Sequence, residues 1–199
     1  MTDGLDKNRI RDLLMEIAER AKQMEVLIEM SVYGGAVMVM EYNSRVSTRD
    51  VDVVVHSGGS SLKKIIDAIA TEHDLDAAWL NDGVKGFISA HPKLQDLFLE
   101  TEHGAGLRVL RPSPEYLLAM KAMAMRSVDA DASSDIDDIR FLLREMNITS
   151  HEQALDIVAG FYPSARISAK TVFGLQEIIE GLAAEDPLQV ALPKGPGDT

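Results

Sequence analysis

The chain has no cysteine among its 199 residues. This absence excludes disulfide bonds, a thiolate nucleophile, redox motifs and any zinc site built on cysteine. Positive charge is also scarce, because 20 Lys and Arg residues stand against 32 Asp and Glu residues, for a formal net charge of -12. Such an acidic chain has no broad electrostatic footprint for nucleic acid, so any contact with RNA requires a local basic patch.

Long apolar runs are missing as well. The N-terminus leads into charged residues without an apolar stretch of signal-peptide length, and no segment reaches the roughly 18 apolar residues of a membrane span. We therefore expect a cytoplasmic protein with no membrane partner. The chain length suits one domain with extensions, built around an ordinary hydrophobic core.

Two common metal and phosphate motifs are absent. The histidines are dispersed and form no pair at positions i and i+4, which argues against a zinc hydrolase; they are His56, His73, His91, His103 and His151. The segment Ser57–Lys64 lacks the spacing of a phosphate-binding P-loop. A turn followed by a helix cap at Ser60 or Ser61 is the preferred interpretation.

The most informative stretch contains a glycine pair, Gly34-Gly35, followed by two aspartates, Asp50 and Asp52. The β-branched run Val51–Val55 predicts a strand buried on both faces, whose period of two places both carboxylates on one side. Two like charges roughly 5 Å apart repel by about 3 kcal/mol at an effective dielectric near 20. A folded chain therefore keeps them side by side only with a cation or positive groups between them, and Mg²⁺ carrying nucleotide phosphates suits two carboxylates.

The glycine pair lies where a predicted strand, Glu25–Tyr33, meets a predicted helix over Ala36–Tyr42. Without Cβ atoms, such a turn lets backbone N–H groups approach a phosphate. A glycine pair alone predicts only a tight turn. Followed by the two aspartates, it predicts a phosphate site next to a metal site.

These motifs carry a family resemblance. The glycine pair and the segment Arg45–Asp52 resemble the signature of the DNA polymerase β-type nucleotidyltransferase superfamily. Downstream, Pro114–Lys121, Arg126 and Asp135–Ile139 are similar to a segment of a bacterial branch that contains the AbiEii and MenT toxins and uncharacterised single-domain relatives. The stretch Trp79–Lys85 also resembles those relatives, and the resemblance covers about residues 25 to 148.

The resemblance implies an α/β (α+β) nucleotidyltransferase fold, with a short mixed sheet, packed helices and a helical C-terminal part. Residues 1–112 are the expected core, 113–186 the helical part and 187–199 a flexible tail.

Apolar periodicity predicts helices over Leu5–Gln23, from Ser60 or Ser61 to His73, over Pro114–Arg126, from Ser134 or Asp135 to Glu145, and over Ser150–Phe161 and Ser168–Ala184. A short strand is expected over Leu107–Leu110.

The resemblance also assigns roles to residues. Asp50 and Asp52 would bind Mg²⁺ or Mn²⁺, and the phosphates of an NTP co-substrate would contact Gly34, Gly35, Arg45, Ser47, Arg49 and Lys121. Superfamily members commonly carry a third carboxylate on a following strand, but Leu107–Leu110 offers none. Asp135 is therefore the expected third catalytic and metal-binding residue, with Asp138 and Glu102 as alternatives.

Simpler interpretations exist for several of these residues. Lys121 could lie on the solvated face of its helix. Asp135 and Asp138 could complement the positive end of a helix dipole. Arg45 and Arg49 could balance the charge of the aspartates, although guanidinium groups also bind phosphates in bidentate fashion.

The implied reaction moves a nucleoside monophosphate from an NTP to an acceptor, releasing pyrophosphate. The acceptor could be a tRNA 3′ end, as in the toxin relatives, a protein side chain or a small molecule. A tRNA end would require a basic rim, for which Lys63, Lys64, Arg108 and Arg111 are the candidates. The alternative is a catalytically inactive module of the same fold, such as an antitoxin or partner-holding protein, and a cognate antitoxin or toxin is a possible partner.

Overall fold

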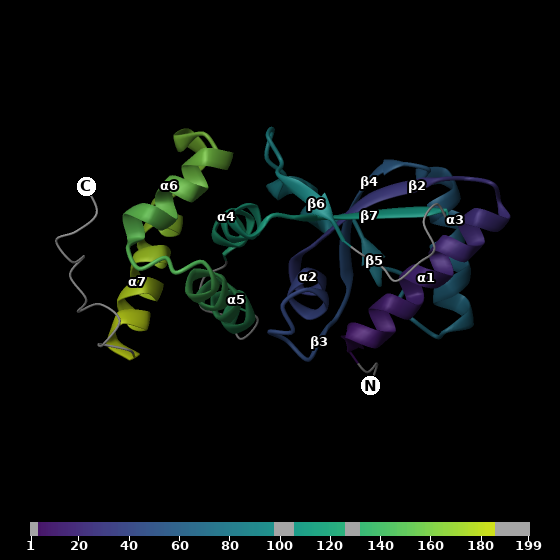
Figure 1. Cartoon of the computed structure of the whole chain (residues 1–199), viewed down its shortest axis with the longest axis horizontal. Helices are drawn as coiled ribbons and strands as arrows, with labels where there is room; N and C mark the ends of the chain where they lie inside the picture. Colours follow the sequence, from purple (N-terminus) through teal and green to yellow (C-terminus); the bar gives the residue numbers. More distant parts are fainter. Residues whose placement is uncertain (1–3, 98–105, 126–131, 186–199) are drawn as a thin grey trace, which may run out of the picture. The chain divides into compact units, whose positions relative to one another are not determined.

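A computed structural model describes residues 4–97, 106–125 and 132–185 (Figure 1). The chain divides into two compact units, Met1–Ser113 and Pro114–Thr199. The first unit is a sheet with helices, and the second is helical. Among the described residues, no helix is both long enough and apolar enough to cross a bilayer.

The first unit contains a mixed five-stranded sheet with the order β5-β4-β2-β7-β6. Its strands are β2 (Ile28–Tyr33), β4 (Val51–Ser57), β5 (Leu80–Asn81), β6 (Leu94–Asp96) and β7 (Leu107–Pro112). Strand β2 is antiparallel to β4 and parallel to β7, while β4 is parallel to β5 and β6 is antiparallel to β7. The expected mixed α/β class is confirmed.

A second, two-stranded sheet pairs β1 (Leu5–Asp6) with β3 (Ser47–Thr48) in antiparallel fashion. The N-terminal segment therefore contacts the loop that leads into β4. Sequence periodicity did not predict these two strands, because two-residue strands carry no detectable pattern.

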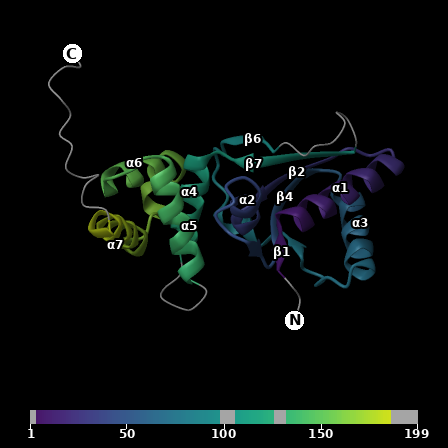
Figure 2. The ribbon, with the colours of Figure 1, turned by 60° about the horizontal axis from the view of Figure 1, so that its bottom comes forward.

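The described residues of this unit also form the α-helices α1 (Lys7–Gln23), α2 (Gly34–Met40) and α3 (Gly59–Glu72) and a short 3-10 helix, η1 (Gly83–Phe87). Helices α1 and α3 lie side by side against one face of the sheet (Figures 1 and 2). The predicted apolar stripe of α1 is confirmed, since Ile10, Leu13, Leu14, Ile17, Ala18 and Ala21 are all buried. Asp6 caps this helix by accepting a hydrogen bond from the backbone N–H of Arg9.

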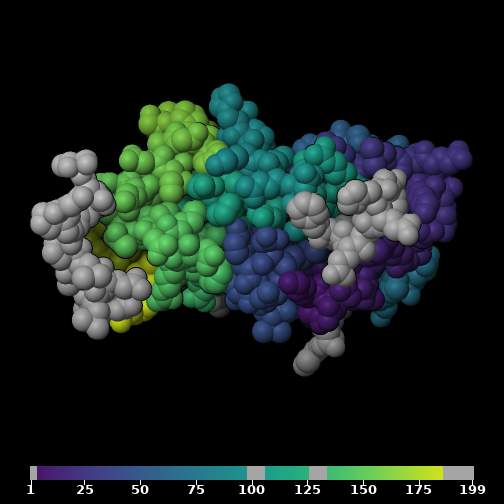
Figure 3. All heavy atoms as spheres, viewed as in Figure 1, coloured from purple at the N-terminus to yellow at the C-terminus, as the bar shows by residue number. Residues whose placement is uncertain are grey.

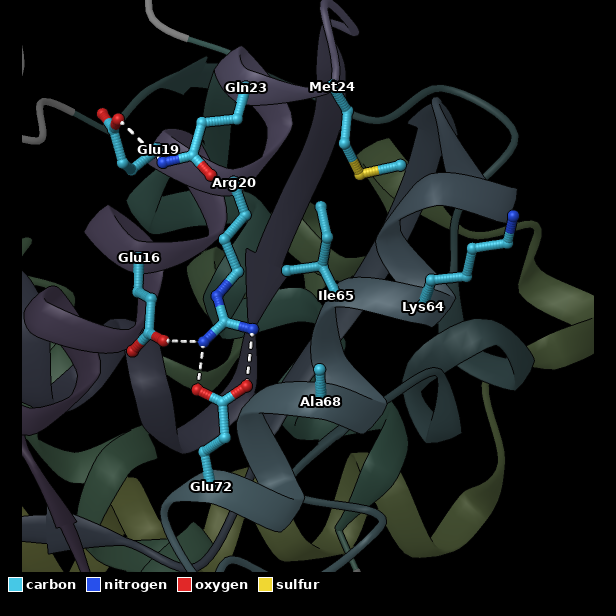
Figure 4. Close-up of a pocket in the computed structure, with 9 residues that line it drawn as sticks. All are labelled: Glu16, Glu19, Arg20, Gln23, Met24, Lys64, Ile65, Ala68 and Glu72. Carbon is cyan, nitrogen blue, oxygen red and sulfur yellow. Dashed lines mark hydrogen bonds and ion pairs between the residues drawn. The ribbon is translucent and has the colours of Figure 1, made fainter.

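Ion pairs join α1 to α3 along a surface groove (Figure 4). The Arg20 guanidinium donates hydrogen bonds to Glu16 on its own helix and to Glu72 on α3. The hydrogen bond from Arg20 lowers the pKa of the Glu72 carboxyl. Met24 and Ile65 supply apolar parts of the groove lining. The two helices are thus connected by charged groups at the surface and by apolar packing below it.

Two local expectations were wrong. Strand β4 is not buried on both faces: Val51 and Val53 are buried whereas Val54 is half-buried, because a helical layer covers one side of the sheet (Figure 2). Helix α3 is capped by Gly58 rather than by a serine. Gly58 has a φ of +74°, and a Cβ there would come within 2.9 Å of the Ile28 side chain. Close approach to β2 therefore selects glycine at this position.

The second unit consists of α4 (Pro114–Ala124), α5 (Ala132–Glu145), α6 (His151–Phe161), η2 (Ser164–Arg166) and α7 (Ala169–Glu185). The four predicted helices are confirmed to within a few residues at their ends. Ser150 caps α6 by accepting a hydrogen bond from the backbone N–H of Gln153. Arg126, the expected end of α4, and the predicted tail over 187–199 lie outside the described residues.

Candidate active site

The glycine turn lies directly against one of the predicted metal ligands. Strand β2 ends at Tyr33, which pairs with Asp52 of β4, and α2 begins at Gly34 with a φ of +62°. A Cβ on Gly34 would lie only 2.8 Å from Oδ2 of Asp52. A side chain at this position would displace the carboxylate, so glycine both permits the backbone conformation and leaves room for Asp52.

The second aspartate comes from the residue before β4. Asp50 Oδ2 accepts a hydrogen bond of 2.8 Å from Nδ2 of Asn81, and Asn81 is the β5 residue that pairs with Asp52. Both aspartates therefore lie at the same end of β4, next to one asparagine. Both residues are half-buried.

The donor set of this pair suits Mg²⁺. Carboxylate oxygens are hard ligands, and Mg²⁺ usually takes one or two of them and completes its shell with phosphate oxygens and water. Within the part of the chain that the structure describes, no group of three or more His, Asp or Glu residues is placed to hold a metal. Asp50 and Asp52 are thus the residues whose chemistry would fit a cation that arrives with a nucleotide.

The loop before β4 brings a hydroxyl and a guanidinium to the same turn. A Cβ on Gly35 would lie 2.6 Å from Oγ1 of Thr48 and 3.4 Å from Nη1 of Arg45. Successive side chains of a strand point to opposite sides, and Oγ of Ser47 lies instead at Gly4, 2.5 Å from where a Cβ would be. The structure therefore brings Arg45 to the turn, together with a threonine that was not among the expected site residues.

The remaining expected residues of this loop are placed differently. Ser47 is in β3 and faces the N-terminal strand, while Arg49 is exposed. Thr48 lies inside the Arg45–Asp52 motif, so alternation along a short strand was the signal that could have identified it. Detecting that strand requires its partner β1, which is distant in sequence.

In the second unit, Lys121 is buried with a relative exposure of 7%. Its Nζ lies 2.8 Å from Oδ1 of Asp135 and 2.7 Å from Oδ2 of Asp138. The interpretation of Lys121 as a solvated lysine is therefore wrong, because burial of an ammonium requires compensating partners of this kind. The structure brings together Lys121, Asp135 and Asp138, and Glu102 lies outside the described residues.

Three residues of the expected basic rim already have acidic partners. Arg108 pairs with Glu29 and Asp96, which raise the pKa of its guanidinium, Asp96 the more strongly. Two further pairs are Arg111 with Glu41 and Lys63 with Asp67. Lys64 lines the groove between α1 and α3, where Glu16, Glu19 and Glu72 also lie (Figure 4). The rim therefore has little uncompensated positive charge.

The surface around the short strand β6 projects from the rest of the first unit. The segment 90–93 that leads into β6 is exposed, and the teal atoms of this region project in the space-filling view (Figure 3). Strand β6 itself is at the edge of the sheet, next to β7. It lies at the opposite edge from β5, which carries Asn81, so this projection belongs to a different part of the sheet from the aspartate pair.

No protein-family model matches the chain, and no curated protein matches it. Among solved structures it is similar to an antigenic nucleotidyltransferase-like protein from Paracoccidioides brasiliensis. The two share 14% sequence identity with a TM-score of 0.45, over 93% of this chain and 92% of the other. A likeness at this identity and TM-score assigns no function to the chain.

Proposed function

We propose that the protein transfers a nucleoside monophosphate from an NTP to an acceptor hydroxyl or phosphate, with Mg²⁺ as cofactor. The observation that carries the proposal is the carboxylate of Asp52 lying against Gly34, with Asp50 held beside it by Asn81. Two half-buried carboxylates at a glycine turn provide a place for a cation and for the phosphates that it binds. The acceptor is a tRNA end, a protein side chain or a small molecule.

In this mechanism the protein mainly positions its substrates. Asp50 and Asp52 would hold the cation, which would supply positive charge to neutralise the phosphates. The backbone of Gly35, the Thr48 hydroxyl and the Arg45 guanidinium would contact the triphosphate from the turn. The acceptor oxygen forms a bond to the α-phosphorus, the bond from that phosphorus to the pyrophosphate oxygen breaks, and the acceptor proton passes to water. Holding the reactants in line lowers the entropic part of the barrier.

Double substitution of Asp50→Ala and Asp52→Ala tests the proposal. The protein is incubated with Mg²⁺, an NTP labelled at the α-phosphate and a cell extract that supplies acceptors. We expect wild type to transfer label and the double variant to lose both transfer and Mg²⁺-dependent NTP binding. Its fold should stay intact or become more stable, because mutual repulsion is removed.

A matched control removes two exposed aspartates of the same unit, Asp12→Ala with Asp67→Ala, and should transfer label like wild type. Transfer at the wild-type rate by the Asp50 and Asp52 double variant would eliminate the metal assignment. A double variant that simply unfolds would show a structural role instead.

One observation favours the second candidate function, a binding module without catalysis. Asp135, the expected third carboxylate, is already paired with Lys121. An ammonium in contact with this carboxylate repels a metal cation, so Asp135 is a poorer metal ligand. The module would bind an NTP or a protein partner without labelling any acceptor, so NTP binding in the absence of transfer under all tested acceptors would identify it.

A further inference from the structure

Asn81 has a position in the sheet that no motif assigns. It is the last residue of β5, pairs with Asp52 across the β4–β5 ladder and donates its Nδ2 hydrogen bond to Oδ2 of Asp50 at 2.8 Å. Nδ2 also lies 3.3 Å from the carbonyl oxygen of Ala78. Asn81 is thus paired with Asp52 in the sheet, and its side-chain amide is hydrogen-bonded to Asp50.

A second hydrogen bond determines which end of the amide faces Asp50. The backbone N–H of Gly83 donates to Oδ1 of Asn81 at 2.8 Å, so the oxygen is on the side of Gly83 and the NH₂ group is on the side of Asp50. An amide flip would place two donors against each other at Gly83 and two acceptors against each other at Asp50. The orientation of the side chain is therefore determined by its two partners.

The backbone at Gly83 is close to both groups. A Cβ on Gly83 would lie 3.0 Å from Oδ1 of Asn81 and 3.5 Å from Oδ1 of Asp52. The sequence Asn81-Asp82-Gly83 thereby forms one wall of the space next to the aspartate pair. The absence of a side chain at Gly83 leaves Asn81 and Asp52 uncrowded.

We propose that Asn81 is a positioning residue. Its amide holds Asp50 beside Asp52, and it puts a neutral side chain, rather than a third carboxylate, next to the two aspartates. This inference rests on the proposed function, since it concerns the carboxylates that would bind the nucleotide's cation. The amide fixes Oδ2 of Asp50 and leaves Oδ1 for the cation. A neutral donor orients a carboxylate without cancelling its charge, whereas a third carboxylate would add repulsion whenever the cation is absent.

The experiment compares cation binding by the full chain and two variants, Asn81→Ala and Asn81→Asp. Electron paramagnetic resonance measures Mn²⁺ affinity in the presence of a non-hydrolysable ATP analogue, and thermal unfolding is recorded with and without Mn²⁺. For Asn81→Ala we expect an approximately tenfold loss of Mn²⁺ affinity, as is typical when a residue that orients a metal ligand is removed. A purely structural residue would lower the unfolding temperature without this selective loss.

The isosteric variant Asn81→Asp should differ from wild type in how its unfolding temperature responds to Mn²⁺. It also tests the proposal if the alanine variant does not fold. Without Mn²⁺ its unfolding temperature should fall below that of wild type, because a third carboxylate then faces Asp50. With Mn²⁺ its gain in unfolding temperature should exceed that of wild type. The matched control Asn43→Asp makes the same chemical change at an exposed residue that contacts Lys7, and should behave like wild type in both measurements.

The outcomes separate the two hypotheses. Wild-type Mn²⁺ affinity in Asn81→Ala, or an unchanged unfolding temperature of metal-free Asn81→Asp, would overturn the role of Asn81 and leave the proposed function in place. If wild type itself binds no Mn²⁺ with the nucleotide, the proposed function fails and the inference fails with it.

Discussion

Two pairs of aspartates in this chain are stabilised in different ways. Asp50, next to Asp52 in the first unit, accepts its hydrogen bond from a neutral amide, and both side chains are half-buried. Asp138, whose side chain is only 2% exposed, and Asp135 are instead bridged by the ammonium of Lys121. The amide donor leaves the charge of the Asp50 carboxylate in place, whereas the lysine compensates the charges of Asp135 and Asp138. The second arrangement is that of a structural ion pair, and the first fits the role that we propose for Asp50.

The largest effect is expected when the lysine that bridges Asp135 and Asp138 is replaced. Lys121→Met leaves the carboxylate of Asp138 buried without its cation, and we expect a loss of about 3–5 kcal/mol in the free energy of unfolding, measured with denaturant. The same change at the exposed Lys63, which pairs with Asp67, should cost less than about 1 kcal/mol.

Adding Asp138→Asn to Lys121→Met should recover part of the lost stability, because the buried charge is removed. A single variant Lys121→Met that is as stable as wild type would show that the pair is not structural. The contrast between the two aspartate pairs would then disappear.

A substitution of intermediate effect tests the phosphate contacts that we propose beside the first aspartate pair. Thr48→Val keeps the shape of the side chain but removes the hydroxyl that faces Gly35, and we expect NTP to bind about tenfold more weakly, as for loss of one hydrogen bond to a charged group. Ser47→Ala, on the opposite side of the same strand, should leave the NTP dissociation constant within about twofold of wild type. Equal losses in both variants would contradict the assigned orientation of β3.

The smallest expected effect concerns an exposed ion pair, Arg20 with Glu72. Arg20 lowers the pKa of Glu72 below its ordinary value of 4.5, so this carboxylate contributes stability above that pH and loses the contribution as pH falls through its folded pKa. Glu72→Gln should therefore be slightly less stable than wild type at neutral pH, with the difference closing in acid. Thermal unfolding across this pH range measures it.

The control for this measurement is Glu19→Gln, at an exposed glutamate of α1 whose hydrogen-bond partner is the neutral Gln23. The stability difference between this variant and wild type should vary less with pH, since no cation pairs with Glu19 in that bond. A pH dependence of equal size in both variants would indicate that general charge, rather than the Arg20 pair, is responsible.

Helical parts of the fold were predictable because their signals are local. The apolar stripe of α1 repeats every three to four residues and matches the buried face, and Ser150 caps α6 as its chemistry suggests. The cap of α3 was mispredicted because Gly58 is selected by contact with Ile28, a residue of another element. A cap determined by a distant neighbour has no local pattern.

The sequence by itself determined that a glycine pair at a strand-to-helix turn precedes a strand with two aspartates at its start, because backbone freedom and side-chain alternation act between near neighbours. Only the tertiary structure decided that Thr48 rather than Ser47 faces the turn, that Asn81 holds Asp50 and that Lys121 bridges Asp135 and Asp138. Each of these depends on pairing between segments far apart in the chain. The hydrogen bonds and charges of a site are arranged by such long-range packing, which residue spacing does not encode.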